Sequence, residues 1–187
     1  VAVKNHGNAL YNPYAQRPME LTIEDVRSSP MVSTPLTMLD ICTMSDGAAV
    51  AILASEEIAT RISDRPILVS GIGSGTDTMR MADRPQGDVM LLPHESDSDY
   101  KDLRWPGVHS FRGARAAAIG AYKMAGINDP RTELDFVELH DAYTSAEIQT
   151  YEDLGLCKYG QGGAFIESGA SGLSGDMPVN PSGGLLA

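Results

Sequence analysis

The chain has 187 residues, of which 42% are hydrophobic and 21% charged, and 14 basic against 25 acidic residues give a net charge of −11. A chain of this length and composition can bury a core of its own, which excludes a protein that is disordered throughout. The acidic balance counts against nucleic-acid binding, because the few cations do not gather in one basic stripe. It does not exclude a small phosphate-bearing ligand, since one local cation and a few backbone N–H groups can hold a phosphate.

Cysteine usage and hydropathy indicate the compartment. Cys42 and Cys157 are the two cysteines, far apart and without a C-x-x-C pair, which indicates neither a disulfide framework nor a zinc knuckle. The apolar run at 48–54 is far shorter than the ~20 residues that span a bilayer. We therefore expect a soluble, cytoplasmic protein with no membrane span. The chain begins at Val1 in strand-like sequence and stops at Ala187 after a glycine turn, so neither end resembles a natural terminus.

The first part of the chain predicts a loop, a short helix, a strand and a second helix. Residues 4–20 carry Asn, Gly and Pro without an apolar period, which is typical of a loop. Thr22, followed by two carboxylates, is a helix N-cap signal. The continuous apolar run at 48–54 favours a strand covered on both faces, and Ser55 then caps a following helix.

The later part alternates strands with helices. Residues 67–71 predict a strand, and the spaced glycines at 71, 73 and 75 favour a tight turn over a nucleotide-binding loop, because the third glycine of G-x-G-x-x-G is missing. Residues 81–110 predict a long polar surface loop. Residues 111–125 predict a helix ended by Gly126, residues 134–139 a strand, and residues 144–154 a helix. This alternation predicts an α/β layered fold.

His140 is the first candidate for chemistry. It follows a predicted strand and precedes a predicted helix, where reactive groups collect in open α/β sheets. The alternative is a structural bridge at a strand end. Glu138 shares its strand face and could in principle join it on a metal, but no third ligand is evident, and His94 and His109 are read as solvated loop residues. We therefore expect no metal. Both cysteines are read as buried small apolar residues rather than nucleophiles.

Three segments together resemble the thiolase superfamily: residues 45–49 (SDGAA), 140–143 (HDAY) and 180–184 (NPSGG), in this order. They are most similar to its sterol-carrier-protein and archaeal branch of acetyl-CoA acetyltransferases, in which an H-D-x-F motif replaces N-E-A-F. The opening residues 4–6 (KNH) and residues 151–155 (YEDLG) resemble the same branch. Tyr143 stands where Phe is commoner.

The resemblance implies a five-layered αβαβα fold, here partial, built from two related halves. Residues 1–57 would end the first half with its loop excursion, and residues 58–187 would form the second half, truncated before its last catalytic loops. The implied activity is acyl transfer on acyl-CoA or acetyl-CoA, by Claisen condensation or thiolysis, with CoA as substrate carrier and no other cofactor.

The resemblance also implies site residues and partners. His140 would be catalytic, as a hydrogen-bond donor to the developing enolate oxygen. The residues implied to lie at the substrate are Lys4, Asn5, His6, Asn180, Gly183 and Gly184. The nucleophilic cysteine of such enzymes comes earlier than this chain begins, so these residues alone should be inactive and should tend to aggregate. A homodimer or homotetramer and a zinc-ribbon/OB-fold partner protein are implied. Two alternatives stay open: a non-catalytic thiolase-like lipid or acyl-CoA binding protein, and a non-catalytic subunit of a thiolase complex.

Overall fold

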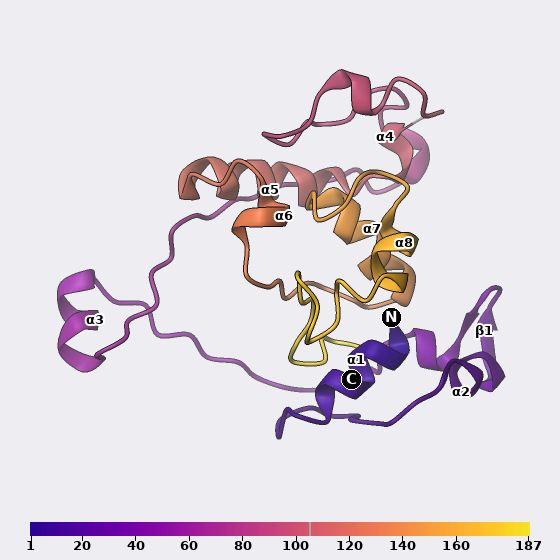
Figure 1. Ribbon diagram of the computed structural model, residues 1–187, viewed down its shortest axis with the longest axis horizontal. Coiled ribbons are helices and arrows are strands. Elements are labelled where there is room, and N and C mark those ends of the chain that lie inside the picture. Colours follow the sequence, from indigo (N-terminus) through magenta and orange to yellow (C-terminus); the bar gives the residue numbers. More distant parts are fainter. Residues whose placement is uncertain (105) are drawn as a thin grey trace.

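The computed structural model of the protein describes residues 1–104 and 106–187. Figure 1 shows α5, α7 and α8 gathered in one part of the molecule and α1, α2 and the β1–β2 hairpin in another, with α3 at the tip of a long extended excursion. The elements are α1 (Ala2–Ala9), α2 (Ile23–Ser28), β1 (Met31–Ser33), β2 (Leu36–Thr37), α3 (Glu56–Ile62), α4 (Pro106–His109), α5 (Arg112–Ala125), α6 (Pro130–Glu133), α7 (Thr144–Asp153) and α8 (Gly162–Glu167), with 3-10 turns at Met38–Asp40, Met81–Asp83 and Asp97–Asp99.

The predicted helix starts at Thr22 and Ser55 are confirmed. Thr22 closes a capping box at the start of α2, in which its hydroxyl accepts from the Asp25 N–H and the Asp25 carboxylate accepts from the Thr22 N–H. The Ser55 hydroxyl accepts from the Ile58 N–H at the start of α3. Both caps use only neighbouring residues, and this is why the sequence alone reveals them.

The two longer predicted helices are also confirmed, as α5 and α7. The α5 helix ends at Gly126, whose φ of 76° is the left-handed conformation that glycine adopts without a steric penalty. The α7 helix covers ten residues and stops before Gly155, where φ is 75°. These two helices carry most of the residues on which the candidate site is built.

The predicted loop at 4–20 is wrong over its first residues, which form α1. Asn5 and Asn8 are poor signals for a helix by composition, and a glycine lies between them at position 7. Their side chains instead hydrogen-bond to residues more than 130 positions away, such as Asp141 and Asn180. Tertiary contacts therefore stabilise this helix where local propensity does not.

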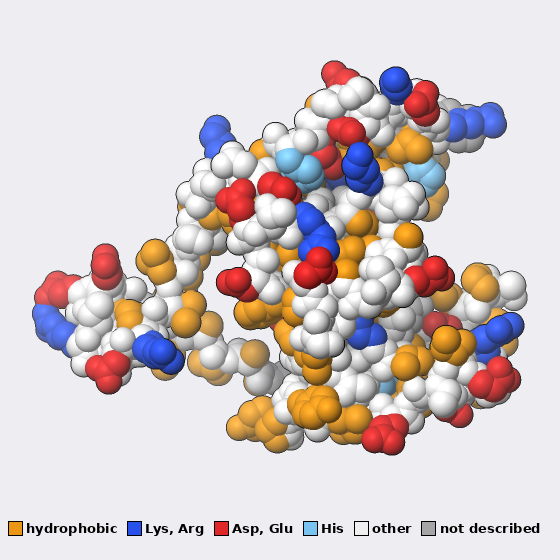
Figure 2. Space-filling view, in the orientation of Figure 1, with side chains coloured by type: hydrophobic (Ala, Val, Ile, Leu, Met, Phe, Trp, Pro, Cys, Tyr) orange, Lys and Arg blue, Asp and Glu red, His pale blue; other side chains and the backbone are white. Residues whose placement is uncertain are grey.

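The strands predicted at 48–54, 67–71 and 134–139 are not formed as strands. Among the described residues, β1 and β2 make the one sheet, an antiparallel pair with Met31 opposite Thr37 and Ser33 opposite Leu36. Segments 48–54 and 67–71 run as extended chain with their apolar side chains exposed, Val50 at 88% and Ile67 at 93%. Figure 2 shows hydrophobic side chains on the surface along this excursion. Segment 134–139 makes a single parallel bridge between Val137 and Val179. A strand needs a neighbour to satisfy its backbone. Among the described residues, segments 48–54 and 67–71 pair with no strand, and segment 134–139 pairs only at this bridge.

The glycines at 71, 73 and 75 form no tight turn. This segment is extended and lies directly against α5 (Figure 1). A Cβ added at Gly73 would lie 1.8 Å from the Ala117 carbonyl oxygen, and one at Gly75 would lie 2.0 Å from that of Gly113. The spaced glycines are therefore explained by close approach of one backbone to another, not by turn geometry.

The buried core lies between α5, α7 and α8. One cluster centres on Tyr151 and Phe165, whose rings pack edge to face at 5.0 Å, and a second joins Leu92 to Ala118 and Tyr122. The predicted polar loop at 81–110 is irregular apart from short turns and α4, as expected; its residue 105 lies outside the described residues. Within the described chain, no helix has the length and apolar character needed to cross a membrane. The predicted domain boundary near residue 57 stays a prediction.

Candidate functional site

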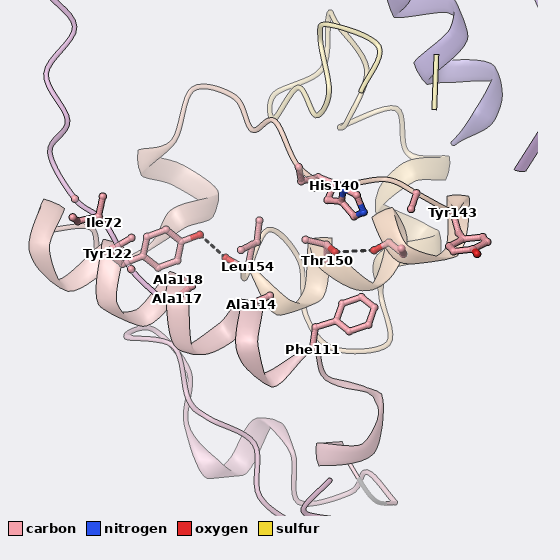
Figure 3. Close-up of a pocket in the computed structure, with 16 residues that line it drawn as sticks. Ile72, Phe111, Ala114, Ala117, Ala118, Tyr122, His140, Tyr143, Thr150 and Leu154 are labelled. Carbon is pink, nitrogen blue, oxygen red and sulfur yellow. Dashed lines mark hydrogen bonds between the residues drawn. The ribbon is translucent and has the colours of Figure 1, made fainter. Parts of the chain in front are cut away.

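His140 lies in the wall of an apolar cavity of about 870 Å³. Figure 3 shows its ring on the segment that leads into α7, with Phe111 and the alanines of α5 and Thr150 of α7 around the same space. The cavity is lined by Gly71, Ile72, Gly73, Phe111, Ala114, Ala117, Ala118, Ala121, Tyr122, Leu139, His140, Ala142, Tyr143, Ala146, Thr150 and Leu154. Small side chains on one face of α5 leave this space open.

Two hydroxyl groups of the cavity wall are already engaged. The Tyr122 hydroxyl donates to the Leu154 carbonyl at 2.9 Å, and the Thr150 hydroxyl donates to the Ala146 carbonyl at 2.8 Å (Figure 3). Burial raises the pKa of Tyr122 to about 12, so this phenol is neutral at physiological pH. The His140 imidazole, in contrast, has no hydrogen-bond or ion-pair partner within the described part of the chain. Its ring N–H can therefore be offered to a bound molecule.

Directly after His140 the chain enters a buried polar network, made of Lys4, Asn5, Asp141, Glu147 and Asn180. Each of Asn5, Asp141, Glu147 and Asn180 is fully buried. The Asn5 amide donates to Asp141 at 2.7 Å and to Glu147 at 2.6 Å. Glu147 also accepts from the Asn180 amide at 2.8 Å and lies 2.9 Å from the Lys4 ammonium. The network thus joins α1, the His140 segment, α7 and the C-terminal loop.

Burial removes water from the charged groups of this network and disfavours their charged forms. Burial lowers the pKa of Lys4, and the neighbouring Glu147 carboxylate opposes that effect. Burial likewise raises the pKa of Asp141, against hydrogen bonds from Leu185, Asn5 and Leu186 that favour its charged form. These groups remain in the interior because each charge has a partner or several donors.

The turn at 180–184 packs directly on Asp141. The Asp141 carboxylate accepts from the backbone N–H of Leu185 at 2.6 Å and of Leu186 at 3.3 Å. Gly184, with φ of 68°, has no room for a side chain, since a Cβ there would lie 2.4 Å from an Asp141 oxygen. Gly183, with φ of 102°, approaches Ala9 of α1 in the same way.

The structure brings most of the predicted site residues together, but not around His140's cavity. Lys4, Asn5 and Asn180 meet at Glu147, and Gly184 contacts Asp141. His6 is separate and 1% exposed; its Nδ1 lies 2.7 Å from the Arg17 carbonyl oxygen. None of the six residues predicted to lie at the substrate is among the described residues that line the cavity. Their contact with a substrate stays a prediction.

Sequence reasoning missed Glu147 as the centre of this network. The residue lies on α7 three positions after Thr144 and four before Tyr151, on the face that packs inward. Its carboxylate also accepts a hydrogen bond from the Tyr151 hydroxyl. The available signal was a carboxylate on the inward face of a helix, between two other buried residues. Its partners could not be inferred, because they lie in distant segments.

A second buried charge, Arg115 of α5, was also missed. Its guanidinium pairs with Glu95 and donates to the Met90 carbonyl at 2.7 Å, which holds part of the polar 81–110 segment against α5. Asp153 lies 3.9 Å from Arg115 and accepts from the Phe111 N–H at 2.9 Å. Burial raises the pKa of Asp153 to about 6. This cluster supports the helices that form the cavity.

Glu138 and Cys157, which were weighed as a metal ligand and a nucleophile and set aside, have other surroundings in the structure. The Glu138 carboxylate accepts from the N–H and the hydroxyl of Ser182 at 2.9 and 2.8 Å. Across the described residues, no three His, Cys, Asp or Glu side chains lie together as a metal site would require. Burial raises the pKa of Cys157 to about 12, so its thiol carries almost no thiolate at neutral pH.

Residues 95–187 match the protein family described as "Thiolase C-terminal domain-like". Over all 187 residues the chain is 37% identical to an acetyl-CoA acetyltransferase of Methanothermobacter thermautotrophicus, of which it covers 43%. The chain is thus similar to the thiolase family. It is also 34% identical to sterol carrier protein 2 of Oryctolagus cuniculus, with 98% of this chain and 30% of that protein covered. A benzoylsuccinyl-CoA thiolase subunit, BbsB, of Thauera aromatica is 33% identical, with 100% of this chain and 43% of that subunit covered.

The chain thus spans less than half the length of the curated relatives that it matches. Among solved structures, a chain of an Ltp2-ChsH2(DUF35) aldolase matches with a TM-score of 0.75 and 24% identity, over 100% of this chain and 44% of that one. This likeness supports a partial thiolase-like α/β layered fold and says nothing further about activity.

Proposed function

We propose that this thiolase-like chain is part of an acyltransferase acting on acyl-CoA or acetyl-CoA, by Claisen condensation or thiolysis, with CoA as substrate carrier and no separate cofactor. The observation that supports it best is His140: an imidazole without a protein partner in the described chain, in the wall of an apolar cavity. Relatives named as acetyl-CoA acetyltransferases support the same reaction.

In this proposal His140 donates a hydrogen bond to the thioester carbonyl oxygen. When a proton leaves the α-carbon, negative charge develops on that oxygen, and a donor in an apolar site stabilises it more than water would. As the resemblance to thiolases implies, the nucleophile would be a cysteine thiolate outside residues 1–187. Within these residues, burial raises the pKa of the Cys157 thiol. Residues 1–187 alone would then be inactive.

A second candidate is a thiolase-like protein that binds a lipid or acyl-CoA without transferring the acyl group. It is favoured by the apolar lining of the cavity and by the similarity to sterol carrier protein 2. As further parts of the proposal, the protein is cytoplasmic, forms homodimers or homotetramers, and has a zinc-ribbon/OB-fold partner. The solved relative that combines a DUF35 partner with an aldolase, and the relative named as a thiolase subunit, support such a partner.

The two candidates differ in one assay. The full-length protein, incubated with acetoacetyl-CoA and CoA, is expected to consume the acetoacetyl-CoA and release two molecules of acetyl-CoA for each one cleaved. A binding protein would bind acetoacetyl-CoA without this product. Absence of acetyl-CoA, with acetoacetyl-CoA binding intact, would favour the second candidate over the first.

A further inference from the structure

We infer that Asp141 and Asn180 are positioning residues, which fix the backbone on either side of His140 and thereby aim its imidazole; this rests on the proposed function. His140 itself has no polar partner in the described chain, so its direction depends on the peptide units beside it. The two residues next to it, Leu139 and Asp141, are held by hydrogen bonds from the turn at 180–186.

On the N-terminal side of His140, the backbone is held by Asn180. Its side-chain oxygen accepts from the Leu139 N–H at 2.8 Å, and its own N–H donates to the Val137 carbonyl at 2.8 Å. Asn180 adopts a left-handed φ of 50°, which an Asn tolerates better than most residues. This conformation lets one residue bond to the segment through both its backbone and its side chain.

On the C-terminal side, the anchor is the Asp141 carboxylate. It accepts from Leu185 N–H at 2.6 Å, Leu186 N–H at 3.3 Å and the Asn5 amide at 2.7 Å. Because Gly184 presses against this carboxylate, a change at Asp141 shifts the turn as well as the His140 segment. Asp141 is fully buried, so water does not replace the lost donors easily.

These hydrogen bonds matter for catalysis because a displaced catalytic group lowers turnover strongly. A misplacement of about 1 Å can lower turnover by about a hundredfold while binding is kept. A residue that acts only by stabilising the fold would not show this pattern. A residue that acts through His140 should also lose its effect once His140 is removed.

The test is a double-mutant cycle on the full-length protein, read as kcat and KM in acetoacetyl-CoA thiolysis. Asp141→Asn is expected to lower kcat by about 10- to 100-fold with little change in KM. In a His140→Ala background it should lower kcat no further. Asp25→Asn is the control: the Asp25 carboxylate also accepts from a backbone N–H, that of Thr22, but at the exposed start of α2 and outside the wall of the cavity. It should leave kcat unchanged.

The outcomes separate the inference from the proposed function. If Asp141→Asn lowers kcat by the same factor with and without His140, the positioning role is wrong, although His140 itself can still be catalytic. If His140→Ala alone leaves turnover unchanged, the proposed site is wrong. Should Asp141→Asn fail to fold, Asn180→Gly takes its place, since glycine accepts the φ of 50° and removes the acceptor of the Leu139 N–H. The kcat of Asn180→Gly is then compared with and without His140, and the same two outcomes distinguish a positioning role from a merely structural one.

Discussion

Replacing His140 with Ala is expected to lower kcat of the full-length protein by about 10²- to 10³-fold, close to 3 kcal/mol of barrier, which is typical of removing one oxyanion donor. Substrate binding should change far less, because the hydrogen bond strengthens as charge develops on the carbonyl oxygen and not in the ground state. The effect is measured by steady-state kinetics of acetoacetyl-CoA cleavage, with KM and kcat determined separately.

The matched control is His109→Ala. His109 is an exposed imidazole at the end of α4 and belongs to no cavity wall around His140. Removing it should leave kcat within about twofold, the effect expected of a surface change. A His140→Ala protein that turns over as fast as the His109→Ala protein would contradict the role that we assign to His140.

Replacing Glu147 with Ala is expected to lower the free energy of unfolding by about 3–5 kcal/mol, the range for breaking a buried ion pair by removal of one partner. The Lys4 ammonium, with a side chain 11% exposed, would lose its counter-charge, and the amides of Asn5 and Asn180 would lose an acceptor. Urea unfolding followed by circular dichroism measures the change. The double variant Lys4→Met, Glu147→Leu should recover part of it, since apolar side chains can replace a buried pair.

The control for this prediction is the exposed pair of Glu57 and Arg61 on α3. Their side chains are 74% and 68% exposed, and pairs of this kind contribute about 0.5 kcal/mol or less. Glu57→Ala should therefore move the urea midpoint very little. Equal shifts for Glu57→Ala and Glu147→Ala would mean that the buried network does not stabilise the fold as described.

Helices α2, α3, α5 and α7 were predictable from the sequence because their signals are local. Thr22 and Ser55 cap their helices with side chains three residues from their partners, and Gly126 ends α5 with its own backbone conformation. The predicted strands depend instead on neighbours. Segment 48–54 has the apolar run of a buried strand, but a strand forms only where another strand meets it, and none does here.

The candidate site was predictable only in part. His140 was found from its place between a strand-like segment and a helix, and the motif at 140–143 supported it. Glu147 was missed because its partners, Lys4, Asn5 and Asn180, lie between 33 and 143 positions away, and no periodicity reports such pairings. Helix α1 was missed for the same reason: its amides are received in distant segments, that of Asn5 by buried carboxylates and that of Asn8 by the Asn180 carbonyl.

The measurement that tests the proposed acyl transfer most directly is the intact mass of the full-length protein after incubation with acetyl-CoA, followed by peptide mapping. We predict a gain of one acetyl group, on a cysteine outside residues 1–187, with Cys42 and Cys157 unmodified. A protein that binds acetyl-CoA but gains no acetyl group, or that is acetylated on Cys42 or Cys157, would contradict the assignment.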